Sequence, residues 1–370
     1  MQNSDIKSQR LVSLDVLRGL TVAGMILVNN GYGESFATLR HTRWNGLTAC
    51  DLVFPFFLFI MGVSCYLSLS KGDFTASTSV LKKVLKRAAL LFLLGLFINW
   101  FDHAIEGDLL CFGHLRVWAV LQRIALCYLA VSLFALYVSH RYTIHTMVAL
   151  LVVYTILIIY GNGYAEDASV NILAQTDLKI FGYDHLYHKS PVDPEGLLGT
   201  ISSVAHVLLG FYCGKIVKYW PSLGGKVSML AITGAVLLAG GLLLSLWLPL
   251  NKRIWSPSYV LATCGLASLL LSAMMYWVDL WPQTSGRKAP GSMLQTFFRV
   301  FGVNALALYI ASELLAIIFG HFGISDAIYA TLHAVITPDK LASLAYALTF
   351  VAINFLLGFF LYKKRIFIKL

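Results

Sequence analysis

Apolar runs long enough to cross a lipid bilayer recur along the whole of this 370-residue chain. A hydrocarbon layer of about 30 Å needs roughly 20 apolar residues in a helix, and only helices and closed barrels satisfy their backbone hydrogen bonds in lipid. The runs are continuous rather than alternating, which favours helices. Charged residues make up 12% of the chain, against about 25% in a soluble domain. The sequence therefore predicts an all-α, polytopic membrane helix bundle.

Ten spans account for these runs, with both termini on the same side. We expect them at residues 11–30, 50–70, 86–101, 117–138, 143–161, 198–218, 226–248, 257–278, 295–319 and 341–362. The first run contains Asp15 and Arg18, and no small-residue cleavage site follows it, so we interpret it as a membrane helix and not as a signal peptide. Residues 1–370 are expected to form one transmembrane domain.

The lysines and arginines indicate how the bundle is oriented. With the N-terminus inside, 18 of the 28 Lys and Arg fall in inside segments and 8 fall in outside segments. Such an asymmetry predicts that both termini are cytoplasmic. It also accounts for the net charge of +10, and because no basic groove or aromatic-interleaved soluble module is present, we expect no nucleic-acid partner. The longest connection, 162–197, would lie outside.

Several polar side chains fall within the predicted spans, where an ionised group is costly without a partner or a purpose. Asp15 and Arg18 are three residues apart and can pair on one helix face. The others are Asn29, Asn30, Gln122, Arg123, Asn304, Ser312 and Glu313. One buried polar group often serves only to join helices, but a set of this size predicts a polar cavity, which suits a transporter or a membrane-embedded enzyme equally well.

The segment from His41 to Pro55 carries the chemistry that we expect outside. A histidine can take a proton from an amine or accept an acyl group, and the carboxylate of Asp51 can orient its imidazole. Asp51 can also simply cap the second span, since a carboxylate is favourable at a helix N-terminus. Other histidines compete with His41 for a catalytic role, namely His103, His114, His185, His188 and His206.

Metal and nucleotide motifs are weak or missing. His185 and His188 lie three residues apart beside Asp184, but no second ligand pair has a clear spacing. The six cysteines show no metal spacing either. There is no P-loop, no dinucleotide-binding glycine pattern and no nucleophile elbow. We therefore expect no metal.

An ordered series of short motifs resembles the heparan-α-glucosaminide N-acetyltransferase family of transmembrane acetyltransferases, over nearly the whole chain. The motifs are residues 13–19 (SLDVLRG), 44–48 (WNGLT), 51–55 (DLVFP), 59–62 (FIMG), 120–123 (VLQR), 193–196 (DPEG), 198–201 (LGTI), 251–252 (NK), 255–256 (WS) and 258–260 (SYV). The resemblance implies that acetyl-CoA is supplied from the cytosol and that its acetyl group goes to the amine of a glucosamine on the other side. The family's catalytic histidine precedes the Trp-Asn-Gly stretch, which is the position of His41.

The resemblance assigns the neighbours of His41, and the chemistry of their side chains suggests roles for the remaining candidate residues. Asp51, with Asn29 or Asn30, would be a neighbour of His41, and Asn45 or these asparagines would donate to the oxyanion of the reaction. Arg18, Gln122 and Arg123 would contact acetyl-CoA, because guanidinium groups suit phosphates. The sugar-binding candidates are Glu195, Asn251, Lys252, Trp255 and Tyr259. Trp255 and Tyr259 can alternatively anchor the chain at the membrane interface.

Departures from the family pattern concern the acceptor more than the donor. Ser312 stands before Glu313, where the family has a histidine, and the 162–197 connection differs in length and content. An O-acyltransferase acting on a sugar hydroxyl and a transporter of a sugar or lipid headgroup remain alternatives. We expect the inner membrane of a bacterium as the location, and a homodimer as a possible assembly. Acetyl-histidine formation and direct transfer to the amine are both open.

Overall fold

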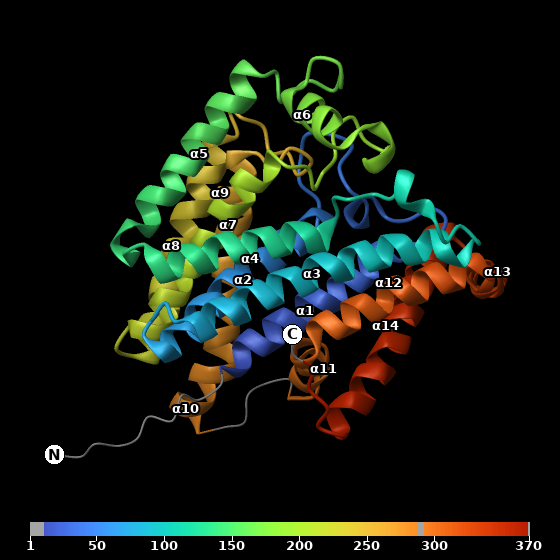
Figure 1. The fold of residues 1–370 in the computed structure, drawn as a ribbon. Coiled ribbons are helices and arrows are strands. Elements are labelled where there is room, and N and C mark those ends of the chain that lie inside the picture. The colour runs from blue at the N-terminus through green and yellow to red at the C-terminus, as the bar shows by residue number, and fades with distance from the viewer. Residues whose placement is uncertain (1–10, 287–291, 369–370) are drawn as a thin grey trace.

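A computed structural model describes residues 11–286 and 292–368, and within these residues it contains helices and loops but no strand (Figure 1). The α-helices are α1 (Val12–Asn29), α2 (Val53–Leu69), α3 (Thr78–Ile105), α4 (Val120–Tyr137), α5 (Thr143–Tyr160), α6 (Ile172–Phe181), α7 (Gly199–Tyr219), α8 (Leu223–Leu244), α9 (Pro257–Met274), α10 (Trp281–Ser285), α11 (Ser292–Val303), α12 (Ala305–His321), α13 (Ile324–Val335) and α14 (Asp339–Lys363). A π-helical turn, Met275–Leu280, joins α9 to α10. The predicted all-α fold is confirmed.

Nine of the described helical segments are long and apolar enough to cross a membrane, and the number is ten when α11 and α12 are taken as one bent span. This agrees with the predicted ten. The side that each terminus faces stays a prediction. Five of the charges used to predict it lie outside the described residues, namely Lys7, Arg10, Arg287, Lys288 and Lys369.

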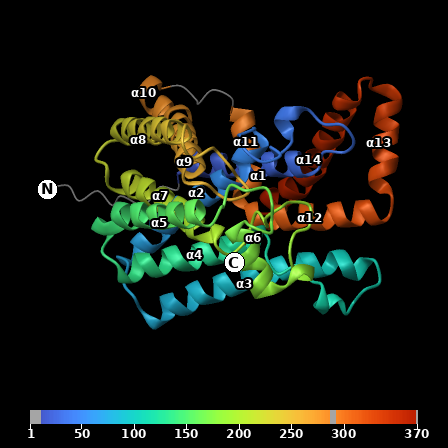
Figure 2. The ribbon, with the colours of Figure 1, turned by 90° about the horizontal axis from the view of Figure 1, so that it is seen from above.

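The helices form two groups with α1 between them. Seen from above, α12, α13 and α14 gather on one side, and α5, α7, α8 and α9 gather on the other (Figure 2). The most extensive pairings are α8 with α9, α2 with α7, and α1 with α11. Helix α1 contacts members of both groups, so it ties the bundle together.

Two glycines let α2 and α7 approach closely. A Cβ on Gly62 would lie 2.2 Å from the carbonyl oxygen of Val207, and a Cβ on Gly210 would lie 2.2 Å from that of Phe59. Such contacts are too short for any side chain. Because lipid gives helices no hydrophobic reason to associate, close backbone packing of this kind is what holds them together. The contact fixes α2, which carries Asp51 just before its first residue.

The ninth predicted span, 295–319, corresponds to a bent pair of helices, α11 and α12. The chain bends by 79° between α11 and α12. At the bend, Asn304 donates from Nδ2 to the carbonyl oxygen of Ile366 and accepts at Oδ1 from the backbone N–H of Ile368, each at 2.9 Å. The Asn304 side chain thus ties the bend to the C-terminal segment, a contact that hydrophobicity alone does not show.

Two other segments extend the predicted boundaries. Helix α3 has 28 residues where the prediction was 86–101, because its first turns carry lysines that an apolar window leaves out. Ser77 caps it, accepting from the backbone N–H of Val80 at 3.3 Å. The 162–197 connection is not all loop, since it contains α6, and α13 was not expected at all.

Candidate functional site

Asp51 is the fixed point of the candidate site. It lies in the one-turn helix Cys50–Leu52 before α2 and is fully buried. Its Oδ2 accepts four hydrogen bonds, from the backbone N–H and the hydroxyl of both Thr42 and Thr48, at 2.9 to 3.2 Å. A carboxylate with so many donors on one oxygen stays ionised and cannot rotate. Its other oxygen is thereby aimed at one partner.

That partner is His41. Its Nδ1 lies 2.7 Å from Asp51 Oδ1, while 47% of its side chain is exposed. Since the carboxylate oxygen accepts, Nδ1 carries a hydrogen, and Nε2 is the ring nitrogen that does not bond to the carboxylate. The predicted pairing of His41 with Asp51 is therefore present, and it gives His41 the orientation that a base or a nucleophile requires.

Lys252 is the third member of this group, although it lies 211 residues after His41 in the sequence. Its Nζ lies 3.1 Å from His41 Nδ1, 3.5 Å from Nε2 and 3.6 Å from Asp51 Oδ1. Only 13% of its side chain is exposed, and this burial lowers the pKa of Lys252, against the opposing attraction of Asp51. Cys50 also approaches, with Sγ 3.2 Å from Nδ1. Lys252, predicted as a sugar contact, thus lies against His41 and Asp51 themselves.

A clamp between two loops holds this arrangement. Asn251 donates from Nδ2 to Asn45 Oδ1 at 3.0 Å, the backbone N–H of Gly46 donates to Leu250 at 2.7 Å, and Arg253 Nε donates to the carbonyl of Arg43 at 2.8 Å. Asn251 is fully buried whereas Asn45 is exposed. Asn251 therefore supports the loop, and Asn45 is the member of the pair that a ligand can reach.

A buried aromatic layer lies beneath the clamp. Tyr259 donates its hydroxyl to the backbone carbonyl of Asp51 at 2.5 Å, and its ring centroid lies 5.2 Å from that of Trp255. Arg123 places its guanidinium 5.3 Å from the Trp255 ring and donates to Gly196 at 2.8 Å. Arg123 and Trp255 are each 1% exposed. Their predicted contacts with acetyl-CoA and sugar stay predictions, and in this structure they support the site from below.

Glu195 belongs to an ion-pair network that the sequence did not predict. One guanidinium nitrogen of Arg116 lies 2.9 Å from both Asp193 Oδ1 and Glu195 Oε2, and the Arg116 group also sits 4.6 Å from the Tyr187 ring. Burial raises the pKa of Asp193, while Arg116 opposes that shift. Glu195 contributes to the charge felt by Lys252, so this network adjoins the His41 group.

The other polar candidates take different places. Asn29 donates to Glu313 Oε1 at 3.2 Å, joining α1 to α12. Asn30 donates within its own helix, to the carbonyl of Ile26 at 2.8 Å. Gln122 is fully buried, packs on Gly95, and has no hydrogen-bond partner for either side-chain polar atom among the described residues. None of the three bonds to His41 or Asp51.

Arg18 lies toward the other end of α1, beside a cavity of about 350 Å³. Its NH1 is 3.2 Å from Asp15 Oδ1, as predicted for this pair, and its NH2 donates to Ser64 at 2.9 Å. Arg87 also lines the cavity, with its guanidinium 4.8 Å from the Tyr128 ring. The sequence alone indicates Arg87 only as one of the charges expected inside. Arg87 lies at the end of the lysine-containing turns of α3, where the apolar part of the helix begins. This position could have indicated that Arg87 faces a polar space within the bundle.

The cavity and the His41 group are separated along α2. Ser64 follows Asp51 by 13 residues, which is about 20 Å of helix at 1.5 Å per residue. Phe57, Ile60 and Met61 of the same helix line the cavity. Two guanidinium groups suit the phosphates of a nucleotide, so the residues present fit the charged end of acetyl-CoA, and α2 leads from there toward His41.

His185 and His188, the weak metal-ligand candidates of the sequence, each face another group of the protein. His185 Nδ1 donates to the carbonyl of Leu115 at 2.7 Å, and the His188 ring lies 4.4 Å from the ring of Tyr183. Both rings therefore have partners within the protein, and the bond of His185 joins the 162–197 connection to the segment before α4.

Comparisons with known proteins agree with the motifs. The profile of the family described as heparan-alpha-glucosaminide N-acetyltransferase, catalytic, matches residues 10–248. The human and mouse proteins named heparan-alpha-glucosaminide N-acetyltransferase are each 26% identical to this chain, over 98% of it. The chain spans 60% of the human protein and 61% of the mouse protein. Since the profile covers well over half of the sequence, the chain belongs to the heparan-α-glucosaminide N-acetyltransferase catalytic family.

Proposed function

We propose that this protein transfers the acetyl group of acetyl-CoA to the amine of a glucosamine-type sugar. The observation that carries the proposal is the contact between His41 Nδ1 and Asp51 Oδ1 at 2.7 Å, in a chain of this family. It leaves an exposed imidazole nitrogen, held by a buried carboxylate, at the end of the bundle remote from the arginine-lined cavity. This is the arrangement that acyl transfer from one side to the other requires.

The donor is bound through its charges. Arg18 and Arg87 hold the phosphates of acetyl-CoA in the cavity of about 350 Å³, a size within the usual range for ligand pockets. Acetyl-CoA supplies an acetyl group activated as a thioester. Ser64 positions Arg18 through the 2.9 Å hydrogen bond, and the stacking of Arg87 on Tyr128 limits its motion.

His41 then acts at Nε2 by one of two routes. As a nucleophile, Nε2 bonds to the acetyl carbon, the sulfur leaves as a thiolate, and the amine later displaces the imidazole. As a base, Nε2 takes the proton of the ammonium, and the amine attacks the thioester directly. In both routes Asp51 stabilises the imidazolium, and Lys252, 3.5 Å from Nε2, stabilises the oxyanion together with the Asn45 amide.

The membrane and the sidedness belong to the same proposal. The excess of Lys and Arg on one set of connections supports cytoplasmic termini, and hence a cytosolic donor and an acceptor on the outer face of a bacterial inner membrane. A homodimer stays a prediction, which a single chain does not test.

Acetyl transfer by purified protein tests the proposal. Protein in liposomes is given labelled acetyl-CoA and glucosamine, and His41→Ala is compared with His188→Ala, a matched exposed histidine that lies on Tyr183. We expect N-acetylglucosamine from the wild type and from His188→Ala, and none from His41→Ala although it binds acetyl-CoA.

Two results would replace the proposal. A product that mild alkali releases is an ester, which would identify an O-acyltransferase. Glucosamine uptake that needs neither acetyl-CoA nor His41 would identify a transporter.

A further inference from the structure

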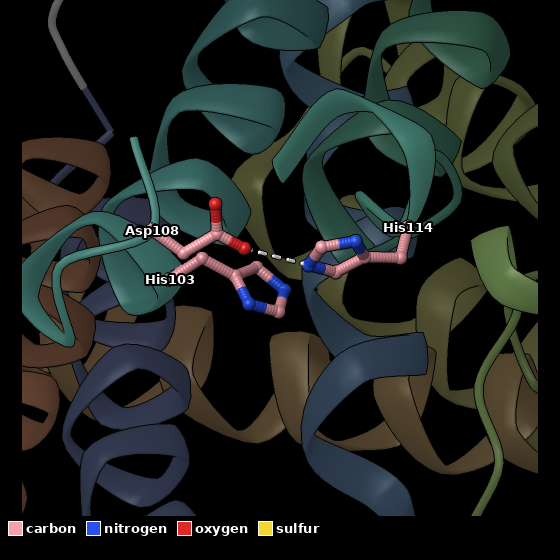
Figure 3. A group of neighbouring side chains, drawn as sticks. All are labelled: His103, Asp108 and His114. Atoms are coloured by element: carbon pink, nitrogen blue, oxygen red, sulfur yellow. Dashed lines mark ion pairs between the residues drawn. The ribbon is translucent and has the colours of Figure 1, made fainter. Parts of the chain in front are cut away.

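A cluster of metal-ligating side chains lies outside the site described above. His103 is in the last turn of α3, and Asp108 and His114 come from the turn that leads toward α4 (Figure 3). Ligand atoms from the three residues lie within 4.8 Å of one another. Asp108 Oδ2 is 2.9 Å from His114 Nε2, and the two imidazole rings are 5.0 Å apart at 83°. The side chains thus point toward a common centre.

The local backbone forms this cluster without help from a ligand. The N–H of Asp108 donates to the carbonyl of His103 at 3.1 Å, and Gly107 turns the chain with a φ of +97°. Trp100 then donates from Nε1 to the carbonyl of Leu109 at 3.1 Å. These contacts fold residues 106–109 back over the end of α3, so Asp108 and His103 are brought together by hydrogen bonds of the main chain and of a neighbouring side chain.

The geometry suits a small tetrahedral ion. Bonds of 2.0 to 2.1 Å at tetrahedral angles place ligand atoms about 3.3 Å apart. The observed pair distance of 2.9 Å and the outer limit of 4.8 Å lie on either side of that value, so the three ligand atoms are already close to the spacing that such an ion needs. Two imidazoles and one carboxylate form a ligand set that favours zinc over magnesium or calcium.

We propose that His103, Asp108 and His114 bind a divalent transition-metal ion, with zinc the best match. The side chains of Asp108 and His114 are 46% and 51% exposed, so an ion can enter from solvent and keep water as its fourth ligand. The site is independent of the proposed acetyl transfer and departs from the expectation that this chain has no metal.

The ion would hold residues 108–114, and the segment that follows them contacts the network beside the His41 group through Arg116. Two residues after His114, Arg116 binds Asp193 and Glu195, and Asn99 of α3 donates to the carbonyl of Arg116 at 2.8 Å. Residues 115–117 are already fixed by these contacts and by the bonds to His185. Metal binding would add a further restraint on residues 108–114, beside the hydrogen bonds that already fold them.

Zinc titration of the full-length protein tests the site. The protein is purified without a polyhistidine tag, and zinc affinity is measured by competition with a chromophoric chelator, with no acetyl-CoA present. The variants His103→Gln, Asp108→Asn and His114→Gln are compared with His333→Gln. This control removes a histidine that also pairs with an aspartate, Asp339, at 2.7 Å.

We expect one zinc ion per wild-type chain and per His333→Gln chain. Each of the three cluster variants should bind it roughly tenfold more weakly or worse, since losing even an outer-shell partner often has that effect. X-ray absorption of the loaded protein should show nitrogen and oxygen ligands with imidazole scattering. Equal affinity in all variants, or sulfur ligands from the cysteines, would overturn the proposal, as would absence of binding. None of these results depends on acetyl transfer.

Discussion

The two ends of the bundle differ in how tightly their polar side chains are held by hydrogen bonds. Around His41, almost every polar atom is engaged: one oxygen of Asp51 accepts four hydrogen bonds, and a second loop clamps the first. Around Arg18 and Arg87 there is a cavity of about 350 Å³, and its lining among the described residues contains no carboxylate. Geometry is therefore fixed where bonds would change, whereas space and positive charge are kept where a large anion would be held.

Under the proposed function, the His41 end would carry out the transfer and the cavity would bind the donor. Changes at the His41 end should lower the rate constant of transfer and leave donor affinity alone, whereas changes at the cavity should weaken donor affinity and affect the rate less. The predictions below test this division, beginning with the largest expected effect.

Replacement of Asp51 by Asn should lower kcat about 10³-fold. The amide can no longer hold the Nδ1 hydrogen of His41 or stabilise the imidazolium, and loss of such a carboxylate typically has an effect of about 10³ to 10⁴. Steady-state kinetics with labelled acetyl-CoA measure kcat, and equilibrium binding measures donor affinity, which should be unchanged. Asp339→Asn, which removes the carboxylate partner of His333, is the control. A fall of less than tenfold would contradict the assigned role.

Loss of both arginines from the cavity should weaken acetyl-CoA binding roughly 100-fold. Hydrogen bonds to charged groups contribute about 1.5 to 3 kcal/mol, and 1.4 kcal/mol corresponds to tenfold. Isothermal titration of acetyl-CoA into Arg18→Ala/Arg87→Ala measures the change. Arg141→Ala, an exposed arginine that donates to Tyr142, should bind like the wild type. Unchanged affinity in the double variant would move the donor site to another part of the bundle.

Asp177 gives the His41 end a pH dependence of stability. Burial raises the pKa of Asp177 to about 6. Among the described residues only its Oδ1 has a hydrogen-bond partner, the N–H of Leu197 at 2.9 Å. The folded carboxyl therefore holds its proton over a range, from about pH 4 to 6, in which the unfolded one has lost it. Folding stability is highest below about pH 4 with respect to this group and falls as pH rises through 6.

Asp177→Asn should accordingly be more stable than the wild type above pH 6, by about 2 kcal/mol, and the difference should vanish near pH 4. Thermal unfolding in detergent at several pH values measures it. Asp184→Asn, in the same connection, is the control. A stabilisation that stays constant with pH would show that the charge of Asp177 is not its cause.

The smallest effect concerns the bend beside the cavity. Asn304→Ala removes two hydrogen bonds to residues 366 and 368 and should lower stability by about 1 to 2 kcal/mol. Acetyl-CoA affinity should fall slightly, because Gly302, Val303 and Ile368 line the cavity. Thermal unfolding and donor titration check both effects. The control is Asn354→Ala, which removes a buried asparagine bonded within its own helix. If acetyl-CoA affinity changes equally in the two variants, the bend has no specific effect on the cavity.

The parts of the fold that follow from continuous hydrophobicity were predictable. The spans at 50–70, 143–161 and 198–218 differ from the observed helices by only a few residues. The bend at Asn304 was not predictable, because its hydrogen bonds go to a segment more than 60 residues away. Hydrophobicity reports that a segment prefers lipid, but it does not report which backbone groups find partners elsewhere.

The site shows the same division between local and distant contacts. The pairing of His41 with Asp51 spans ten residues and could be proposed from one short segment. The position of Lys252, 211 residues from His41, could not, and neither could the network of Arg116 with Asp193 and Glu195. The side of the bundle that Arg18 and Arg123 face depends on helix rotation, which the sequence does not reveal for a helix that is apolar almost all round.

The distance in sequence between His41 and Lys252 has a consequence for biogenesis. After His41 has been synthesised, the ribosome must add 211 residues before the lysine exists, which takes about 10 to 40 s at roughly 5 to 20 residues per second. Until then the imidazole has its carboxylate but lacks the ammonium and the Asn251 clamp. A nascent chain whose first spans are already in the membrane therefore lacks part of the candidate site until the greater part of the protein has been made.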